Sequence, residues 1–316
     1  MFQQLLAAHF VHVALAAAVV VAGLAGLVGP LVVARNNAFA VHGIAELGLT
    51  GAAGGLLVGV DAATGALLGS LAVGLLLGML GLTGRDRDTA TGALLAAGLG
   101  LGVLFLSKLH GYASTGFGLL FGSITSVSDD QLHRLAVTAV IAGAALTLLW
   151  RPLWFSSVDP EVATARGVPV RALAVAFPLV LAVAVAETLQ ITGVLLILTL
   201  LVTPAAAAHR LTTHPGRLLA TSVLLAVTAA VGGTLAGLAF DLPPSCCIAL
   251  LSFTTYAAAR GVPPLARRLS GGDRRAPDRV VTMPLPLVDR PSRVALGRAA
   301  RRHLPSTRCP SRPGAG

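Results

Sequence analysis

Two ionisable side chains lie four residues apart inside a mainly apolar stretch of the sequence. His42 and Glu46 occur in the run AFAVHGIAELGLTG, and residues four apart on a helix lie on the same face. An imidazole nitrogen and a carboxylate oxygen form a half-site for Zn²⁺, which accepts them readily, or for Mn²⁺, which takes further oxygen donors or waters. The simpler alternative is a His–Glu hydrogen bond that locks two helices. The pair alone slightly favours Zn²⁺ as the ion.

Glu187, His9 and His12 are the other candidates for a cation pathway or its entrance. Ionisable groups at membrane depth are costly and for that reason usually functional. Glu187 stands three residues before Gln190, and its alternative role is an exposed carboxylate at the outer mouth of a span. His9 and His12 are three residues apart and share one helical face. Their alternative role is that of ordinary interfacial histidines.

The sequence contains no phosphate-binding loop. The pattern G-x-x-x-x-G-K-[ST] is absent, and the only lysine, Lys108 in LSKLHG, follows no glycine-rich phosphate cradle. The patterns H-E-x-x-H and G-x-S-x-G are absent as well. We therefore do not expect an enzyme, and any ATP hydrolysis that drives this chain must take place on a separate subunit.

The composition requires a membrane around these residues. Hydrophobic residues make up 55% of the chain and charged residues 11%, with a mean hydropathy of +0.83. Soluble domains carry about 25% charged residues. The net charge of +10 comes mostly from residues 263–316, which hold twelve Arg and three Asp. Because no basic face with interleaved aromatic residues is present, nucleic acid is not an expected partner.

Apolar stretches of spanning length, about 20 residues each, recur along the first part of the chain. We predict an all-α membrane helix bundle over residues 1–262 and a disordered Arg/Pro-rich tail over residues 263–316. An arrangement of eight spans, in which two of the helices merge, stays open. Small-xxx-small patterns such as Gly98–Gly102 predict close helix packing. The nine predicted spans are 10–33, 38–59, 63–83, 90–107, 134–150, 171–188, 191–209, 217–240 and 245–262.

The loops between the predicted spans alternate in charge. Arginines follow the first, third, fifth, seventh and ninth spans, whereas the other loops carry Asp61, Lys108, Arg134 and Asp241 with little else. The positive-inside rule then places the N-terminus outside and the tail in the cytoplasm. The predicted location is the bacterial plasma (inner) membrane, where the basic tail is a candidate for contact with anionic lipid headgroups.

The segment 108–133 is too polar and too rich in Gly and Ser to span a membrane. Its short apolar piece, 117–121, is predicted to form a re-entrant or surface half-helix, whose backbone must be satisfied by protein or water. Ser128 or Asp129 is predicted to cap the start of the fifth span.

Three sequence blocks resemble those of metal-ion ABC permeases, the zinc, manganese and iron uptake permeases. The first, DPEVATARGVPVRALAVAFPLVLAVAV from Asp159, is similar to the family's D-P-E-x-A-x-A-x-G-V segment. The second, LQITGVLLILTLLVTPAAAAHRL from Leu189, looks like V-G-x-L-L-V-x-x-L-L-x-x-P-A-A-x-A. The third, DLPPSCCIALLS from Asp241, is similar to D-x-P-P/A-G-P-x-I-x-L-L. The resemblance covers roughly residues 10–262.

The resemblance implies the permease subunit of an ATP-driven importer for a divalent metal ion, Zn²⁺ or Mn²⁺. The implied partners are an ABC ATPase subunit, an extracytoplasmic metal-binding lipoprotein or periplasmic protein, and a second permease copy. That copy is identical in a homodimer or is a related permease. In this family the D-P-E-x-A loop docks into the ATPase, and helix-start signals followed by a glycine agree with a short helix there. The residues carried over to this loop are Asp159, Pro160, Glu161, Ala163, Ala165, Gly167 and Val168.

The sequence departs from the family pattern in the second span, where the family has Asp followed four residues later by His. Here these positions hold His42 and Glu46, so the spacing and donor types persist in inverted order and the identity of the metal is left open. Two alternative functions also stay open. One is a permease for an iron chelate or cobalamin, which needs no His–Glu pair. The other is a secondary transporter or non-transporting scaffold, for which the 159–168 loop would have no partner.

Overall fold

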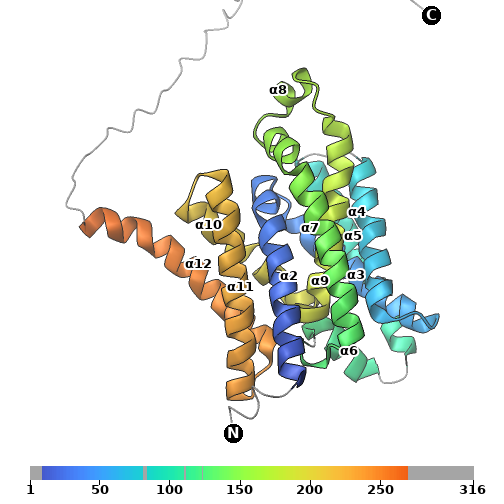
Figure 1. Cartoon of the computed structure of the whole chain (residues 1–316). Coiled ribbons are helices and arrows are strands. Elements are labelled where there is room, and N and C mark those ends of the chain that lie inside the picture. The colour runs from blue at the N-terminus through green and yellow to red at the C-terminus, as the bar shows by residue number, and fades with distance from the viewer. Residues whose placement is uncertain (1–8, 81–83, 110–111, 123, 270–316) are drawn as a thin grey trace, which may run out of the picture. The chain divides into compact units, whose positions relative to one another are not determined.

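The computed structural model describes residues 9–80, 84–109, 112–122 and 124–269, all within one unit that ends at Ser270. All regular structure in these ranges is helical, which confirms the predicted all-α class (Figure 1). The predicted tail beyond residue 269 lies outside the described residues. The elements are α2 (His9–Ala34), α3 (Ala38–Leu57), α4 (Ala62–Leu80), α5 (Gly84–Lys108), α6 (Tyr112–Phe121), a 3-10 turn η1 (Ile124–Ser126), α7 (Asp129–Val158), α8 (Pro160–Ala165), α9 (Val170–Leu201), α10 (Thr203–Leu211), α11 (Pro215–Phe240) and α12 (Pro244–Leu269).

Seven of the described helices are long and apolar enough to cross a membrane. They are α2, α3, α4, α5, α7, α9 as far as Val194, and α11, and they coincide with seven of the nine predicted spans. The predicted span 191–209 is divided between the end of α9, beyond a break at Gly193, and the nine-residue helix α10. The predicted span 245–262 lies within α12, which continues to Leu269 and is not among the seven.

Helix α9 is broken at Gly193, and the short helix α6 packs on the break. The Gly193 backbone angles, φ 71° and ψ 171°, lie in a region that is essentially restricted to glycine. A Cβ at Gly193 would overlap a carbonyl oxygen of α6, and one at Gly122, after the end of α6, would overlap the Ile191 carbonyl. Ser245 donates a hydrogen bond of 2.6 Å to the Phe121 carbonyl. The predicted half-helix is therefore confirmed, and it is fixed to both α9 and α12.

Gly193→Ala is expected to destabilise the folded permease strongly. The left-handed backbone conformation alone costs a non-glycine residue about 1–3 kcal/mol, and the new Cβ would also collide with α6. Thermal unfolding of the purified protein measures the loss, with Gly100→Ala as the control. A Cβ at Gly100 meets nothing within 4 Å. Equal melting temperatures for the two variants would show that the backbone at position 193 accommodates a Cβ without loss of stability.

Helix α3, which carries the His–Glu pair, is held closely by its neighbours α4 and α5. A Cβ at Gly51 would overlap the backbone of Gly65, so this glycine pair brings α3 and α4 into backbone contact. On the α5 side, Thr50 donates a hydrogen bond of 2.7 Å to the Gly98 carbonyl oxygen. A Cβ at Gly102 would lie 3.2 Å from the Thr50 hydroxyl. The close packing predicted from Gly98–Gly102 is thus confirmed, and α3 is fixed along two sides.

The two ends of the bundle differ in their basic residues. We call them the α8 end, where the α2–α3 and α10–α11 turns also lie, and the α6 end, where the α3–α4 and α11–α12 turns lie (Figure 1). Among the described arginines and lysines, Lys108 and Arg134 belong to the α6 end, and the others lie nearer the α8 end.

The predicted cap of the fifth span is also confirmed, since Ser128 accepts a hydrogen bond from the Gln131 amide.

Candidate functional site

His42 and Glu46 lie on one face of α3, as their spacing predicts. His42 Nε2 and Glu46 Oε1 are 3.9 Å apart, and the two side chains are 31% and 4% exposed, respectively. This separation is longer than the 2.7–3.2 Å of a hydrogen bond. The alternative of a His–Glu hydrogen bond that locks two helices is therefore not formed in the structure, where both residues also belong to one helix.

The pair leaves two buried polar atoms without partners in the described part of the chain. Glu46 Oε2 and His42 Nδ1 are both buried, and neither atom forms a hydrogen bond within that part. Buried polar groups are nearly always hydrogen-bonded, since an unpaired one loses its solvation without compensation. A cation bound to the Glu46 carboxylate would give this oxygen a partner, and one imidazole nitrogen of His42 would be the second donor. The residues present thus fit a divalent ion, with two protein donors from this chain.

Within the described residues, no group of three or more His, Cys, Asp or Glu side chains is close enough to hold a metal ion. Stable metal centres use about four to six ligands. A half-site of two donors therefore binds an ion only weakly unless further ligands come from water or another chain. Weak, incomplete coordination suits an ion that must leave again.

Glu187 lies in a separate polar network between α7 and α9. Its side chain accepts hydrogen bonds from Thr138 (2.6 Å) and Gln190 (3.4 Å), and Gln190 in turn accepts one from Gln131 (2.7 Å). The alternative role as an exposed carboxylate is wrong, because Glu187 is only 4% exposed. The network borders a cavity of about 400 Å³ near the α6 end whose lining does not include His42 or Glu46.

The sequence did not indicate the partners of Glu187. Thr138, which donates to Glu187, and Gln131, which donates to Gln190, are 49 and 56 residues before Glu187 in sequence, on another helix. The only signal for Thr138 was its polarity within an otherwise apolar span, and Gln131 lies in the polar run before that span; neither signal indicates which residues meet. The structure does not bring Glu187 to the His–Glu pair.

His9 and His12 lie at the α6 end, at the start of α2. His9 Nε2 is 3.1 Å from both carboxylate oxygens of Asp129, and both of these side chains are largely exposed. His12 is exposed as well. An exposed ion pair contributes at most about 1 kcal/mol. These histidines occupy the surface of the α6 end, apart from the His–Glu pair.

The 159–168 loop folds into a short capped helix at the α8 end. The Asp159 side chain accepts hydrogen bonds from the Glu161 and Val162 amides (3.1 and 3.0 Å), and Pro160 occupies the first helical turn. Gly167, with φ 77°, ends the helix. The Val168 amide then donates back to the Ala163 carbonyl at 3.0 Å. The motif residues thus build a rigid helical projection.

Only one side of α8 is buried against the rest of the protein. Ala163 is 0% exposed, whereas Glu161, Thr164 and Ala165 are exposed to solvent and Val162 is 44% exposed. The projection therefore presents a small mixed surface of one carboxylate, one hydroxyl and apolar groups.

Helices of membrane-spanning length around a buried ionisable pair define a multi-pass membrane protein of the transporter class. The model of the ABC 3 transport family matches residues 7–260, and the chain belongs to that family. The resemblance seen in the three sequence blocks is thereby confirmed.

Individual relatives agree with the family. The chain is 27% identical to the manganese transport system membrane protein MntC of Halalkalibacterium halodurans, over 82% of this chain and 89% of the relative. It is 26% identical to the manganese import system permease protein ScaB of Streptococcus parasanguinis, over 82% and 93%. Among solved structures, PsaBC from Streptococcus pneumoniae in complex with Fab matches with a TM-score of 0.73 and 27% identity, over 85% of this chain and 98% of that one.

Proposed function

We propose that the chain is the membrane-spanning permease subunit of an ATP-driven importer for a divalent metal ion. The observation that carries the proposal is the buried Glu46 carboxylate with its unpartnered oxygen, one helical turn from His42. The relatives named as manganese permeases support the same substrate class. The family supports ATP hydrolysis as the energy source, and a partner subunit would carry it out, since this sequence has no phosphate-binding loop.

The proposed orientation has the α8 end in the cytoplasm of the bacterial plasma membrane. The excess of arginines at that end supports it through the positive-inside rule. The C-terminal tail then lies in the cytoplasm, because α12 ends on the same side as α8 (Figure 1). The α6 end, with His9 and His12, faces outward and would receive ions from an extracytoplasmic metal-binding protein.

The proposed partners follow from this orientation. The exposed side of α8 would bind the ATPase subunit on the cytoplasmic side. A second permease copy would complete the metal site, because each chain offers only two donors and a homodimer would offer four. A related permease with its own donors would serve equally.

Mn²⁺ is the ion that we place first, ahead of Zn²⁺. A His–carboxylate pair accepts either ion, and the inverted order of the pair does not distinguish them. The names of the relatives favour Mn²⁺, which reverses the slight preference for Zn²⁺ drawn from the pair alone.

Uptake by proteoliposomes that contain the permease, its ATPase and its metal-binding protein tests the function. We expect ATP-dependent accumulation of Mn²⁺ or Zn²⁺ and no accumulation of cobalamin or a ferric chelate, because a half-site of one imidazole and one carboxylate binds a bare ion. Liposomes with a non-hydrolysable ATP analogue are the control. Accumulation of the chelate or of cobalamin in place of the bare ions would establish the alternative permease, and uptake without ATP would establish a secondary transporter.

A further inference from the structure

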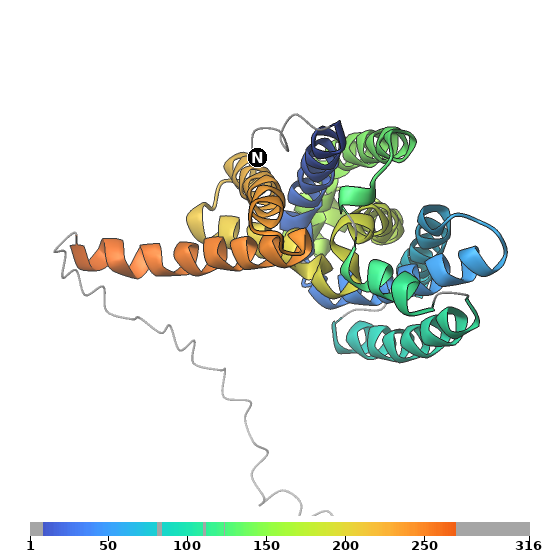
Figure 2. The same cartoon turned by 90° about the horizontal axis from the view of Figure 1, so that it is seen from below.

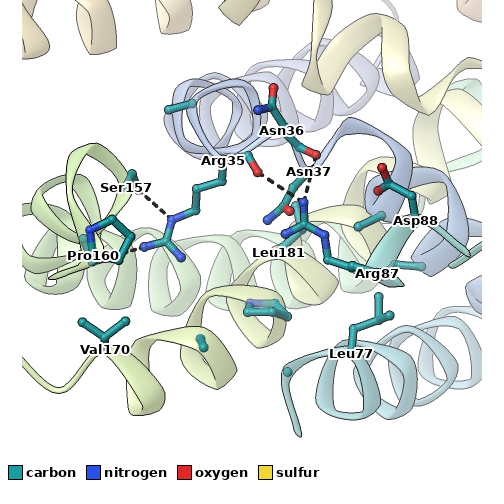
Figure 3. A pocket seen from close by; sticks show the side chains of 17 residues that line it. Arg35, Asn36, Asn37, Leu77, Arg87, Asp88, Ser157, Pro160, Val170 and Leu181 are labelled. Atoms are coloured by element: carbon teal, nitrogen blue, oxygen red, sulfur yellow. Dashed lines mark hydrogen bonds between the residues drawn. The ribbon is translucent and has the colours of Figure 1, made fainter. Parts of the chain in front are cut away.

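A cavity of about 810 Å³ opens at the α8 end of the bundle, away from the His–Glu pair (Figure 3). Its walls come from the α2–α3 turn, the end of α4, the start of α5, the end of α7 and the start of α9. Ala40 and Ile44 are the residues of α3 that line it. Each of them is two positions from His42, about 200° away around the helix. Helix α3 therefore separates the cavity from the candidate metal site.

Two arginines line the cavity, Arg35 from the α2–α3 turn and Arg87 from α5. Arg35 donates hydrogen bonds through Nε to Ser157 (2.8 Å) and through Nη2 to Ser156 (2.6 Å). Arg87 donates through Nη2 to the carbonyl oxygens of Arg35 and Asn36 (3.4 and 3.2 Å), as the dashed lines in Figure 3 show. The Arg35 guanidinium also lies over the Phe177 ring, 5.0 Å from its centroid, and Arg87 Nε is buried without a partner in the described ranges.

These two positive charges have no counter-ion in the described part of the chain. No carboxylate forms an ion pair with Arg35 or Arg87, although Asp88 also lines the cavity. Burial, and in second place the charge of Arg87, lowers the pKa of Arg35 to about 10, so the Arg35 side chain stays charged at neutral pH. Two like charges held together are destabilising until an anion lies between them. The same charges repel a divalent cation, so this cavity does not suit the metal.

The floor of the cavity is apolar. Besides the arginines, the lining includes the apolar residues Ala40, Ile44, Leu77, Ala174 and Leu181. A small hydrophilic anion such as free phosphate would leave this part of the cavity without a complementary surface. A ligand with a charged head and an apolar chain fits both halves.

We propose that this cavity binds an anionic phospholipid, with the headgroup phosphate between Arg35 and Arg87 and the start of an acyl chain on the apolar floor. Guanidinium groups match phosphate oxygens in geometry and can bind them in pairs. Basic pockets between membrane helices on the cytoplasmic side hold anionic headgroups in this manner. The lipid would contact the α2–α3 turn, α5 and α7 together, near the start of α8. The proposal goes beyond metal import and does not depend on which ion is carried.

Native mass spectrometry of the purified full-length permease tests the proposal. The protein is titrated with phosphatidylglycerol, with phosphatidylcholine and with inorganic phosphate. We expect one phosphatidylglycerol to bind in preference to phosphatidylcholine, and Arg87→Gln to weaken that binding at least tenfold. Arg87→Lys should retain part of it, because the charge remains without the paired geometry. Arg217→Gln, which removes an exposed arginine at the same end, is the control and should leave the binding unchanged.

Each other outcome overturns the proposal. If Arg87→Gln and Arg217→Gln weaken phosphatidylglycerol binding equally, the lipid binds only to the general basic surface. Binding of inorganic phosphate that depends on Arg87, without preference for phosphatidylglycerol, would assign the anion site to a free ion and exclude the lipid. Unchanged melting temperature of Arg87→Gln verifies that the variant is folded, and Arg35→Gln provides the independent test from the opposite wall.

Discussion

Glu46→Gln is expected to lower the rate of metal uptake at least tenfold while the amount of folded permease stays normal. The amide keeps the size of the side chain but removes the charge that attracts the ion, and each 1.4 kcal/mol of lost binding free energy is a factor of ten. His42→Ala should have a comparable effect, since it removes the nitrogen donor from the same face. Uptake of Mn²⁺ and Zn²⁺ into proteoliposomes at equal permease content measures both.

The melting temperatures of the variants distinguish a pathway role from a structural role for His42 and Glu46. Glu46 is a buried carboxylate with one unpartnered oxygen, so its neutral replacement should leave the melting temperature unchanged or raise it. A residue that holds helices together would instead lower it. Asp86→Asn, at an exposed carboxylate in the first turn of α5, is the matched control and should transport normally. If Glu46→Gln and His42→Ala both import metal at the unaltered rate, the path is lined by other residues.

Combined replacement of Glu161 and Gly167 by alanine is expected to reduce transport-coupled ATP hydrolysis at least tenfold. Glu161 is exposed on the first turn of α8, and Gly167 ends that helix with a positive φ. The first change removes the carboxylate offered to the ATPase, and the second strains the turn that fixes the direction of α8. Metal-stimulated phosphate release by the assembled transporter measures the loss, and copurification of the ATPase shows whether docking fails.

The control for this variant is Gly216→Ala, at the start of α11 on the same end. A Cβ at Gly216 meets nothing within 4 Å, as is also true at Gly167, but Gly216 lacks the positive φ. Gly216→Ala should keep full coupling. Normal copurification together with full coupling in the Glu161/Gly167 variant would show that the ATPase binds elsewhere on the permease.

The sequence alone determined the features that depend on neighbours along the chain. Apolar stretches of spanning length located seven membrane helices, with ends that agree to within six residues except at the end of α7, which continues eight residues further. The spacing of His42 and Glu46 placed both on one face, because helical periodicity is local. Asp159 and Gly167 marked the start and end of α8 for the same reason, since a cap bonds to amides two or three residues away. Three ordered sequence blocks were sufficient to indicate the family.

Only the tertiary structure decided which faces of these helices meet. Lipid-facing and protein-facing residues are both apolar in a membrane protein, so the pattern along a span does not reveal its packing side. The burial of Glu187 against Thr138, the contact between Gly122 and the break at Gly193, and the junction of Arg35 with α7 all join residues distant in sequence. Each depends on how two or more helices are placed in space, and no short segment encodes that placement.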